Sequence, residues 1–193
     1  MTRGSKAARL ATSDALLGAG DVLRFPRAFS RSECATLIEL AGTEEKFRDQ
    51  FRDYGEVRGA SSICWLATAK APTWCVSRVL DLFAQAANAF EFDVSGPLEE
   101  FKLMEYRRGN RVAWHVDCGG GPTRTRKLTM TVLLSEPAAF SGGALTLAGN
   151  AQELHRDIGD AVIFPSFLAH KVSTVTKGRR NTLIAWAHGP PFR

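Results

Sequence analysis

The chain has 193 residues, enough for one sizeable domain, and its 45% hydrophobic and 23% charged residues are ordinary for a folded protein. Its net charge of +5 is too small for a tail that coats nucleic acid, and no apolar run reaches the length of about 18 residues that a membrane span needs. Residues 1–20 lack the apolar core of a secretory signal. The four cysteines form no Cys-x-x-Cys pair, so we expect reduced thiols and a cytoplasmic protein.

The beginning of the chain predicts a loose arm followed by a strand and a helix. Residues 1–20 are polar and rich in Ala and Gly, and we expect a flexible arm there, ahead of a single domain over residues 21–193. Residues 22–29 are expected to form a first strand. Ser30 then begins a helix, because Glu33 follows it at the spacing of a capping box and an amphipathic face comes next.

Three further segments complete the first half of the chain. Residues 43–59 carry many charges with weak periodicity, which predicts a loop or a short helix over an opening. Residues 62–66 are predicted to be a strand. Residues 76–90 place apolar side chains at helical spacing, so we expect a helix that packs on a sheet.

From residue 97 onward, short apolar runs with a period of two alternate with turn signals such as Gly-Gly and Gly-Asp. These runs predict strands at residues 101–106, 112–116, 128–134, 144–147, 161–164, 171–175 and 183–187. Many short strands after two helices predict a mostly β fold with flanking helices (α+β), either a β-sandwich or a jelly roll with the helices outside.

Three side chains of the second half form a candidate metal site. His115 and Asp117 lie two positions apart at the end of an expected strand, so both face the same side. His170 begins a later strand. Two imidazoles and one carboxylate leave three positions of an octahedral metal open, as in non-haem Fe(II) oxygenases. A lone His-x-Asp pair is more often an ordinary hydrogen-bonded contact, so the motif alone leaves both interpretations open.

Arg180 and Thr182 lie on one face of the next strand and strengthen the metal interpretation. An arginine beside a metal can bind the far end of a dicarboxylate with two parallel hydrogen bonds, and a hydroxyl can add a third. By itself, Arg180 is more often a solvated surface charge. The remaining histidines do not share the metal spacing: His155 is expected in a polar hairpin and His188 in the final tail.

Four stretches of the chain resemble the 2-oxoglutarate/Fe(II)-dependent dioxygenases of the prolyl 4-hydroxylase-like branch, and its bacterial hydroxylases in particular. They run from Tyr106 to Asp117, from Arg126 to Leu134, from Phe140 to Leu145 and from Gly159 to Trp186. The resemblance is dense over residues 97–189 and holds only in outline over residues 22–95.

The resemblance implies a double-stranded β-helix (jelly roll) that binds Fe(II), 2-oxoglutarate and O₂. His115, Asp117 and His170 would hold the iron, and no further catalytic residue is implied. Arg180 and Thr182 would bind the far carboxylate of 2-oxoglutarate, and the Tyr106 hydroxyl would reach the same cosubstrate.

The chain differs from some members of this family at one position, and the resemblance also implies the type of reaction. Some relatives have a second tyrosine where this chain has Leu133, so one cosubstrate contact is missing or replaced. Trp186 is expected behind Arg180 as a core residue. The implied reaction converts 2-oxoglutarate to succinate and CO₂ while the substrate is hydroxylated, with ascorbate as a candidate stimulant. Because Asp117 is present, hydroxylation is favoured over halogenation, while desaturation and ring formation stay open.

The substrate is the least defined part of the prediction. We expect a small molecule, an amino acid or a metabolite derived from one, held by residues at the barrel mouth. The candidates are Arg58, Ser61, Trp65, Trp114 and Arg126. Each of these residues could also have a purely structural role, since the tryptophans could be core residues and Arg58 a solvated charge.

Three other functions stay open. The substrate could be a residue in a peptide or protein, or an amino acid on a carrier. A nucleic-acid demethylase would share the chemistry, but Trp186 stands where DNA-repair relatives carry a second arginine. The third alternative is a non-catalytic β-barrel binding module. No feature of the sequence predicts a membrane partner or an oligomeric state.

Overall fold

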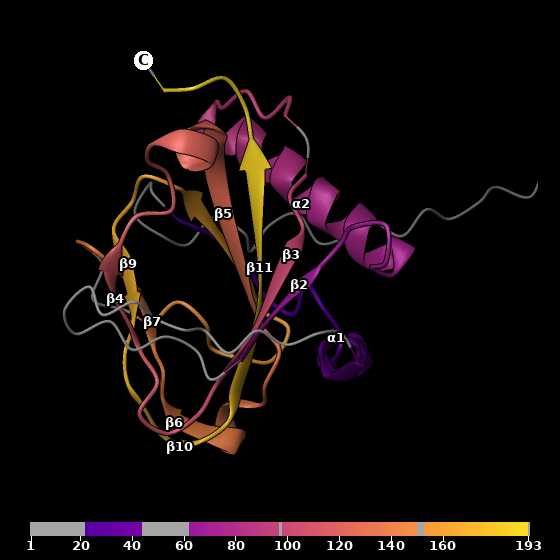
Figure 1. Ribbon diagram of the computed structural model, residues 1–193, viewed down its shortest axis with the longest axis vertical. Helices are drawn as coiled ribbons and strands as arrows, with labels where there is room; N and C mark the ends of the chain where they lie inside the picture. Colours follow the sequence, from indigo (N-terminus) through magenta and orange to yellow (C-terminus); the bar gives the residue numbers. More distant parts are fainter. Residues whose placement is uncertain (1–21, 44–61, 97, 150–152, 193) are drawn as a thin grey trace, which may run out of the picture.

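A computed structural model describes residues 22–43, 62–96, 98–149 and 153–192. Its largest element is an antiparallel six-stranded sheet (Figure 1). In spatial order the strands are β1 (Leu23–Phe25), β8 (Ala161–Pro165), β5 (Arg126–Leu133), β11 (Arg180–His188), β3 (Phe101–Tyr106) and β2 (Ser62–Leu66).

A smaller antiparallel sheet faces the large one and closes a barrel. It consists of β4 (Val112–His115), β9 (His170–Val172) and β7 (Leu145–Leu147). A two-stranded ribbon of β6 (Phe140–Gly142) and β10 (Val175–Gly178) extends one end of the barrel. Two short 3₁₀ helices, Gly121–Thr125 and Pro137–Ala139, flank β5. The arrangement is the jelly-roll, double-stranded β-helix fold that the sequence predicted.

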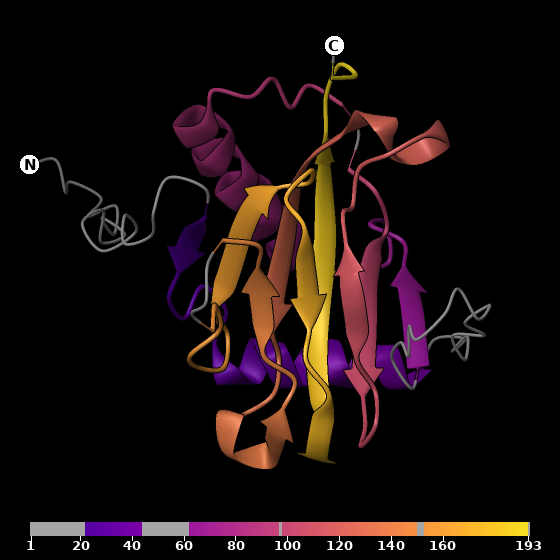
Figure 2. The same ribbon diagram turned by 90° about the vertical axis from the view of Figure 1, so that its left-hand side faces the viewer.

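Both α-helices cover the outer face of the large sheet. They are α1 (Arg31–Thr43) and α2 (Thr73–Phe90), and Figure 2 shows them behind the strands when the smaller sheet faces the viewer. The capping box is present, because the Ser30 hydroxyl accepts from the Glu33 backbone N–H at 3.2 Å and the Glu33 carboxylate accepts from the Ser30 N–H at 2.7 Å. None of the described helices has the length and apolar character needed to cross a membrane.

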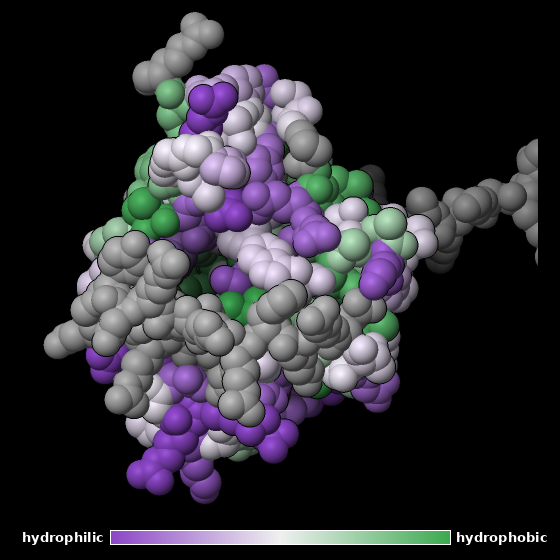
Figure 3. Space-filling view, in the orientation of Figure 1, coloured by the Kyte–Doolittle hydropathy of each residue, from purple (hydrophilic) through white to green (hydrophobic). Residues whose placement is uncertain are grey.

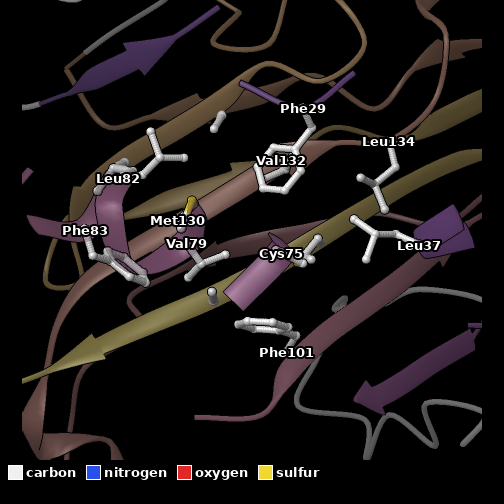
Figure 4. Packing of buried hydrophobic residues seen from close by; sticks show 14 of the residues in the cluster. Phe29, Leu37, Cys75, Val79, Leu82, Phe83, Phe101, Met130, Val132 and Leu134 are labelled. Atoms are coloured by element: carbon white, nitrogen blue, oxygen red, sulfur yellow. The ribbon is translucent and has the colours of Figure 1, made fainter. Parts of the chain in front are cut away.

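The alternation of side chains along the large sheet produces two separate cores. On β8, Ala161 and Ile163 point outward and pack under the helices, while Val162 and Phe164 point into the barrel. The outer core includes Leu37 of α1 and Val79 of α2, which meet the sheet in Figure 4. Since the inner face is only partly filled by apolar side chains, the barrel retains room for a polar cavity.

The predicted segments follow the order of the structure, but several of their ends differ, and β6 was not predicted. The first strand is short because Arg27 adopts a positive φ of 49° and turns the chain. Helix α2 begins at Thr73, before the expected start. The flexible arm at residues 1–20 and the charged segment at residues 43–59, apart from Thr43, lie outside the described residues. The single domain over residues 21–193 stays a prediction.

The strand expected at residues 171–175 is divided in two. His170–Val172 pairs with β4 and β7, whereas Val175 begins a strand that pairs with β6. Between them, the Ser173 N–H donates to the Ala144 carbonyl at 2.9 Å. The chain therefore changes partners within a run that looks continuous in sequence.

Candidate functional site

The three predicted metal-binding residues meet where the smaller sheet faces the large one. His115 of β4 and His170 of β9 are direct partners in the antiparallel pairing, and their ring centroids lie 4.2 Å apart. Asp117 follows β4, and its carboxylate oxygens lie 3.6 Å from Nε2 of His115 and 3.5 Å from Nε2 of His170. All candidate ligand atoms lie within 4.8 Å of one another, so one metal ion could bind all three groups.

Backbone carbonyl groups orient both imidazoles. Nδ1 of His115 lies 2.9 Å from the Ala113 carbonyl oxygen, and Nδ1 of His170 lies 2.9 Å from that of Leu168. A carbonyl can only accept, so Nδ1 carries the proton of the neutral ring and Nε2 presents its lone pair toward Asp117. Both rings are thus held in the tautomer that metal binding requires.

The Asp117 carboxylate is an ionised group held by two further donors. Its Oδ2 accepts from the Thr129 hydroxyl at 2.8 Å and from the Trp186 indole N–H at 3.1 Å. Burial alone would raise the pKa of Asp117, but the interactions with His115 and His170 and the hydrogen bond from Trp186 lower it overall. Burial lowers the pKa of His170. In His115 burial acts the same way, but the interactions with Asp117 and with the Ala113 carbonyl together outweigh it and raise the pKa.

Arg180 lies on the inner face of β11 and is buried, with 2% of its surface exposed. Among the described residues no carboxylate lies within ion-pair distance of its guanidinium, and burial lowers its pKa. Thr182, two residues along the strand, has a buried hydroxyl with no hydrogen-bond partner in the described part of the chain. A buried cation beside an unsatisfied hydroxyl is a good receptor for a carboxylate, because leaving either group unpaired is costly.

Tyr106 lies beside Arg180, with the guanidinium carbon 5.2 Å from its ring centroid. Its hydroxyl donates to the Met104 sulfur at 3.4 Å, a weak acceptor. Leu133, at the position where some relatives carry a second tyrosine, is paired in register with Thr182. Tyr106 and Leu133 thus lie on β3 and β5, the two strands that flank β11 in the sheet.

One cavity of about 440 Å³ contains both the metal-binding cluster and the Arg180–Thr182 pair. Figure 3 shows a hollow on this face of the molecule with apolar surface inside it. Trp65 and Trp114 line the cavity and are 38% and 50% exposed, so their interpretation as core residues is wrong. The cavity thus combines three side chains that could hold a metal ion, a buried arginine beside an unsatisfied hydroxyl, and an aromatic wall.

The other substrate candidates have different surroundings. Arg126 lines the cavity, where its guanidinium forms a bidentate ion pair with Glu99 at 2.8 Å and stacks 3.8 Å from the Trp186 ring centroid. Arg58 and Ser61 lie outside the described residues.

Two expectations about individual side chains are wrong. Trp186 is buried, as expected of a core residue, but it does not lie behind Arg180. It lies farther along the same face of β11, where it donates to Asp117 and stacks on Trp65 at 6.0 Å. His155 was expected in a polar hairpin, but it is buried and contacts Arg180. His155 follows no strand period, so spacing alone could not place it beside Arg180.

Residues 101–188 match the family model described as the 2OG-Fe(II) oxygenase superfamily. This part of the chain is similar to the members of that superfamily. The match includes all three metal-binding candidates together with Arg180, and all four residues line the cavity. These oxygenases use Fe(II), 2-oxoglutarate and O₂.

Individual curated proteins are similar to the same part of the chain. A PKHD-type hydroxylase of Pseudomonas putida F1 is 34% identical over 89 residues, which cover 42% of this chain and 39% of the relative. The chain therefore spans about two fifths of the length of that curated oxygenase relative.

Solved structures of oxygenases show the same fold. A Pseudomonas putida prolyl-4-hydroxylase has a TM-score of 0.66 at 19% identity, over 88% of this chain and 93% of that one. A Trichoplax adhaerens prolyl hydroxylase, solved with a fragment of the hypoxia inducible factor oxygen degradation domain, has a TM-score of 0.69 at 15% identity, over 88% and 84% of the two chains.

Proposed function

We propose that the protein is an Fe(II)- and 2-oxoglutarate-dependent oxygenase that hydroxylates an unactivated C–H bond. 2-Oxoglutarate, O₂ and the substrate would yield succinate, CO₂ and the hydroxylated product. One observation carries the proposal: a single cavity holds two histidines and an aspartate within 4.8 Å of one another, and a buried arginine with no described carboxylate within ion-pair distance. That combination fits an iron ion and a dicarboxylate together.

Different residues of the cavity would bind the iron and the 2-oxoglutarate. His115, Asp117 and His170 would hold the iron, which when bound supplies the activation of O₂. Arg180 and Thr182 would bind the far carboxylate of 2-oxoglutarate. Asp117 keeps its charge through the hydrogen bonds it accepts. None of these steps requires a side chain to act as a general base.

We propose an amino acid or a metabolite derived from one as the substrate. Trp65 and Trp114 support this proposal, because two exposed indoles at the mouth can enclose a small apolar body. A residue within a peptide fits about as well, since the Trichoplax adhaerens relative is described with a bound peptide fragment. Location in the cytoplasm and stimulation by ascorbate stay predictions.

An anaerobic titration tests the proposed cofactors. The purified protein receives Fe(II) and 2-oxoglutarate in turn, while its visible absorbance is recorded. We expect a broad charge-transfer band that needs both additions and that is lost in His115→Ala and Asp117→Ala. A folded, iron-loaded protein without the band would exclude the oxygenase and favour the binding module.

A second experiment decides between the two substrate classes. Succinate formation is measured with a panel of free amino acids and with short peptides that contain the same residues. Stimulation by a free amino acid supports the small-molecule substrate. Stimulation by peptides alone assigns the peptide class.

A further inference from the structure

His155 is a buried histidine that contacts the predicted 2-oxoglutarate receptor from within the protein. It is 4% exposed, and its Nδ1 lies 3.4 Å from a terminal guanidinium nitrogen of Arg180. Its other ring nitrogen, Nε2, lies 3.1 Å from the Thr131 carbonyl oxygen. His155 is not one of the proposed metal ligands, and the proposed function gives it no role.

The two contacts determine the protonation state of the ring. The Thr131 carbonyl can only accept, so Nε2 carries a proton. The guanidinium of Arg180 can only donate, so Nδ1 must present a lone pair. His155 is therefore neutral, and burial together with the charge of Arg180 lowers its pKa to about 3.

Arg180 is restrained along its whole length, and His155 supplies the restraint at the charged end. Gly143 makes room for the stem, since a Cβ there would lie 2.8 Å from Cδ of Arg180. The ring of Tyr106 flanks the guanidinium. His155 contacts a terminal nitrogen, which fixes the direction of the planar group.

We propose that His155 is a positioning residue that orients the Arg180 guanidinium toward the far carboxylate of 2-oxoglutarate. The inference rests on the proposed function. The neutral ring offers an acceptor without adding a negative charge that would compete with the incoming carboxylate. Selectivity for a ligand with a far carboxylate should therefore depend on an acceptor at the position of Nδ1.

The test compares two ligands of equal chain length in anaerobic, Fe(II)-loaded protein. Calorimetry gives the dissociation constants of 2-oxoglutarate and of 2-oxopentanoate, which lacks the far carboxylate. In His155→Leu we expect roughly tenfold weaker binding of 2-oxoglutarate, because a buried guanidinium N–H loses its acceptor. Binding of 2-oxopentanoate should change by less than about twofold, since that ligand does not use the guanidinium.

Two substitutions make the test independent of folding. In His155→Asn the side-chain oxygen can take the place of Nδ1, so selectivity should be largely restored. In His155→Gln the amide lies closer to the place of Nε2, so selectivity should stay low. His188→Leu is the matched control, because it removes another buried histidine that bonds to Thr125 instead of Arg180. If His155→Leu fails to fold, the difference in ligand selectivity between His155→Asn and His155→Gln tests the positioning role.

The possible failures are distinguishable. A wild-type protein that binds both ligands equally would overturn the proposed function itself. A wild-type preference for 2-oxoglutarate that persists unchanged in His155→Leu and His155→Gln would overturn the positioning role alone.

Discussion

At the scale of single residues, the two donors to Asp117 should matter for metal affinity. Trp186→Phe removes the indole N–H that lies 3.1 Å from Oδ2, while the Thr129 hydroxyl remains. We expect metal affinity to fall by about tenfold, because partners that orient a ligand typically contribute this much. Calorimetric titration with Mn(II) measures the change.

Trp65→Phe is the control for this substitution. Trp65 stacks on Trp186 and lines the same cavity, but it does not bond to Asp117. Equal losses of Mn(II) affinity in both variants would show that ring packing, and not the hydrogen bond, supports the metal site.

Some of these residues could be predicted from sequence and others could not, for a physical reason. His115 ends β4 and Asp117 follows it two residues later, at the spacing that places two side chains on one face of an extended chain. His155 has no such period, and its partner Arg180 is 25 positions away. Alternation along β11 predicts which face of the sheet Trp186 lies on. It does not predict that Trp186 contacts Asp117, because this contact depends on the path of the chain after β4.

At the scale of elements, the turn after β6 holds the stem of Arg180. Gly143 has a φ of +70°, and a Cβ there would lie 2.8 Å from Cδ of Arg180. Gly143→Ala should cost about 1 kcal/mol through its backbone conformation and should also displace Arg180. We expect weaker binding of 2-oxoglutarate by calorimetry.

Gly149→Ala separates these two effects. Gly149 has a similar φ of +82°, but nothing lies within 4 Å of its missing Cβ. A similar loss of stability with unchanged 2-oxoglutarate affinity is expected for this control. If both substitutions weaken 2-oxoglutarate binding alike, backbone strain explains the effect and contact with Arg180 does not.

Another element whose stability can be tested is α1, which begins with a reciprocal capping box. Ser30→Ala removes the side-chain acceptor of the Glu33 N–H, and we expect a loss of about 1 kcal/mol in the free energy of unfolding. Urea denaturation measures this loss. Glu39→Ala, at an exposed position of the same helix, should change stability by less than about 0.5 kcal/mol. A Ser30→Ala variant as stable as the control would contradict the capping role.

Element boundaries were predictable where one local signal decides them. The capping box of Ser30 and Glu33 predicts the start of α1 without reference to any tertiary contact. The strand expected at residues 171–175 fails because two different sheets compete for it, and pairing partners are a tertiary property. The strand β6 was missed because it has three residues and two exposed side chains.

At the scale of the whole molecule, the two faces of the large sheet explain why sequence alone reached the fold class. Apolar residues on one face meet α1 and α2, and those on the other face meet the smaller sheet. Alternation along each strand predicts both layers. It does not predict the volume that remains between the sheets, because that volume depends on how side chains from both sheets meet.

The buried, neutral state of His155 should make global stability depend on pH. Its pKa is about 3 in the folded protein and 6.5 in a solvated chain. Above 6.5 both states leave the ring neutral, so its contribution is fully present there. As the pH falls from 6.5 toward 3, only the unfolded chain takes up the proton, and stability decreases by about 1.4 kcal/mol per pH unit.

The prediction compares metal-free wild type with His155→Asn by urea denaturation at pH 7 and pH 5. Wild type should lose roughly 2 kcal/mol more than the variant over this interval. Burial lowers the pKa of His170 and adds to the loss, while the raised pKa of His115 opposes it, but both histidines remain in the variant. The lowered pKa values of Asp117 and Asp160 act at lower pH. Parallel losses in the two proteins would mean that His155 is accessible to protons in the folded state, contrary to its closed position between Thr131 and Arg180.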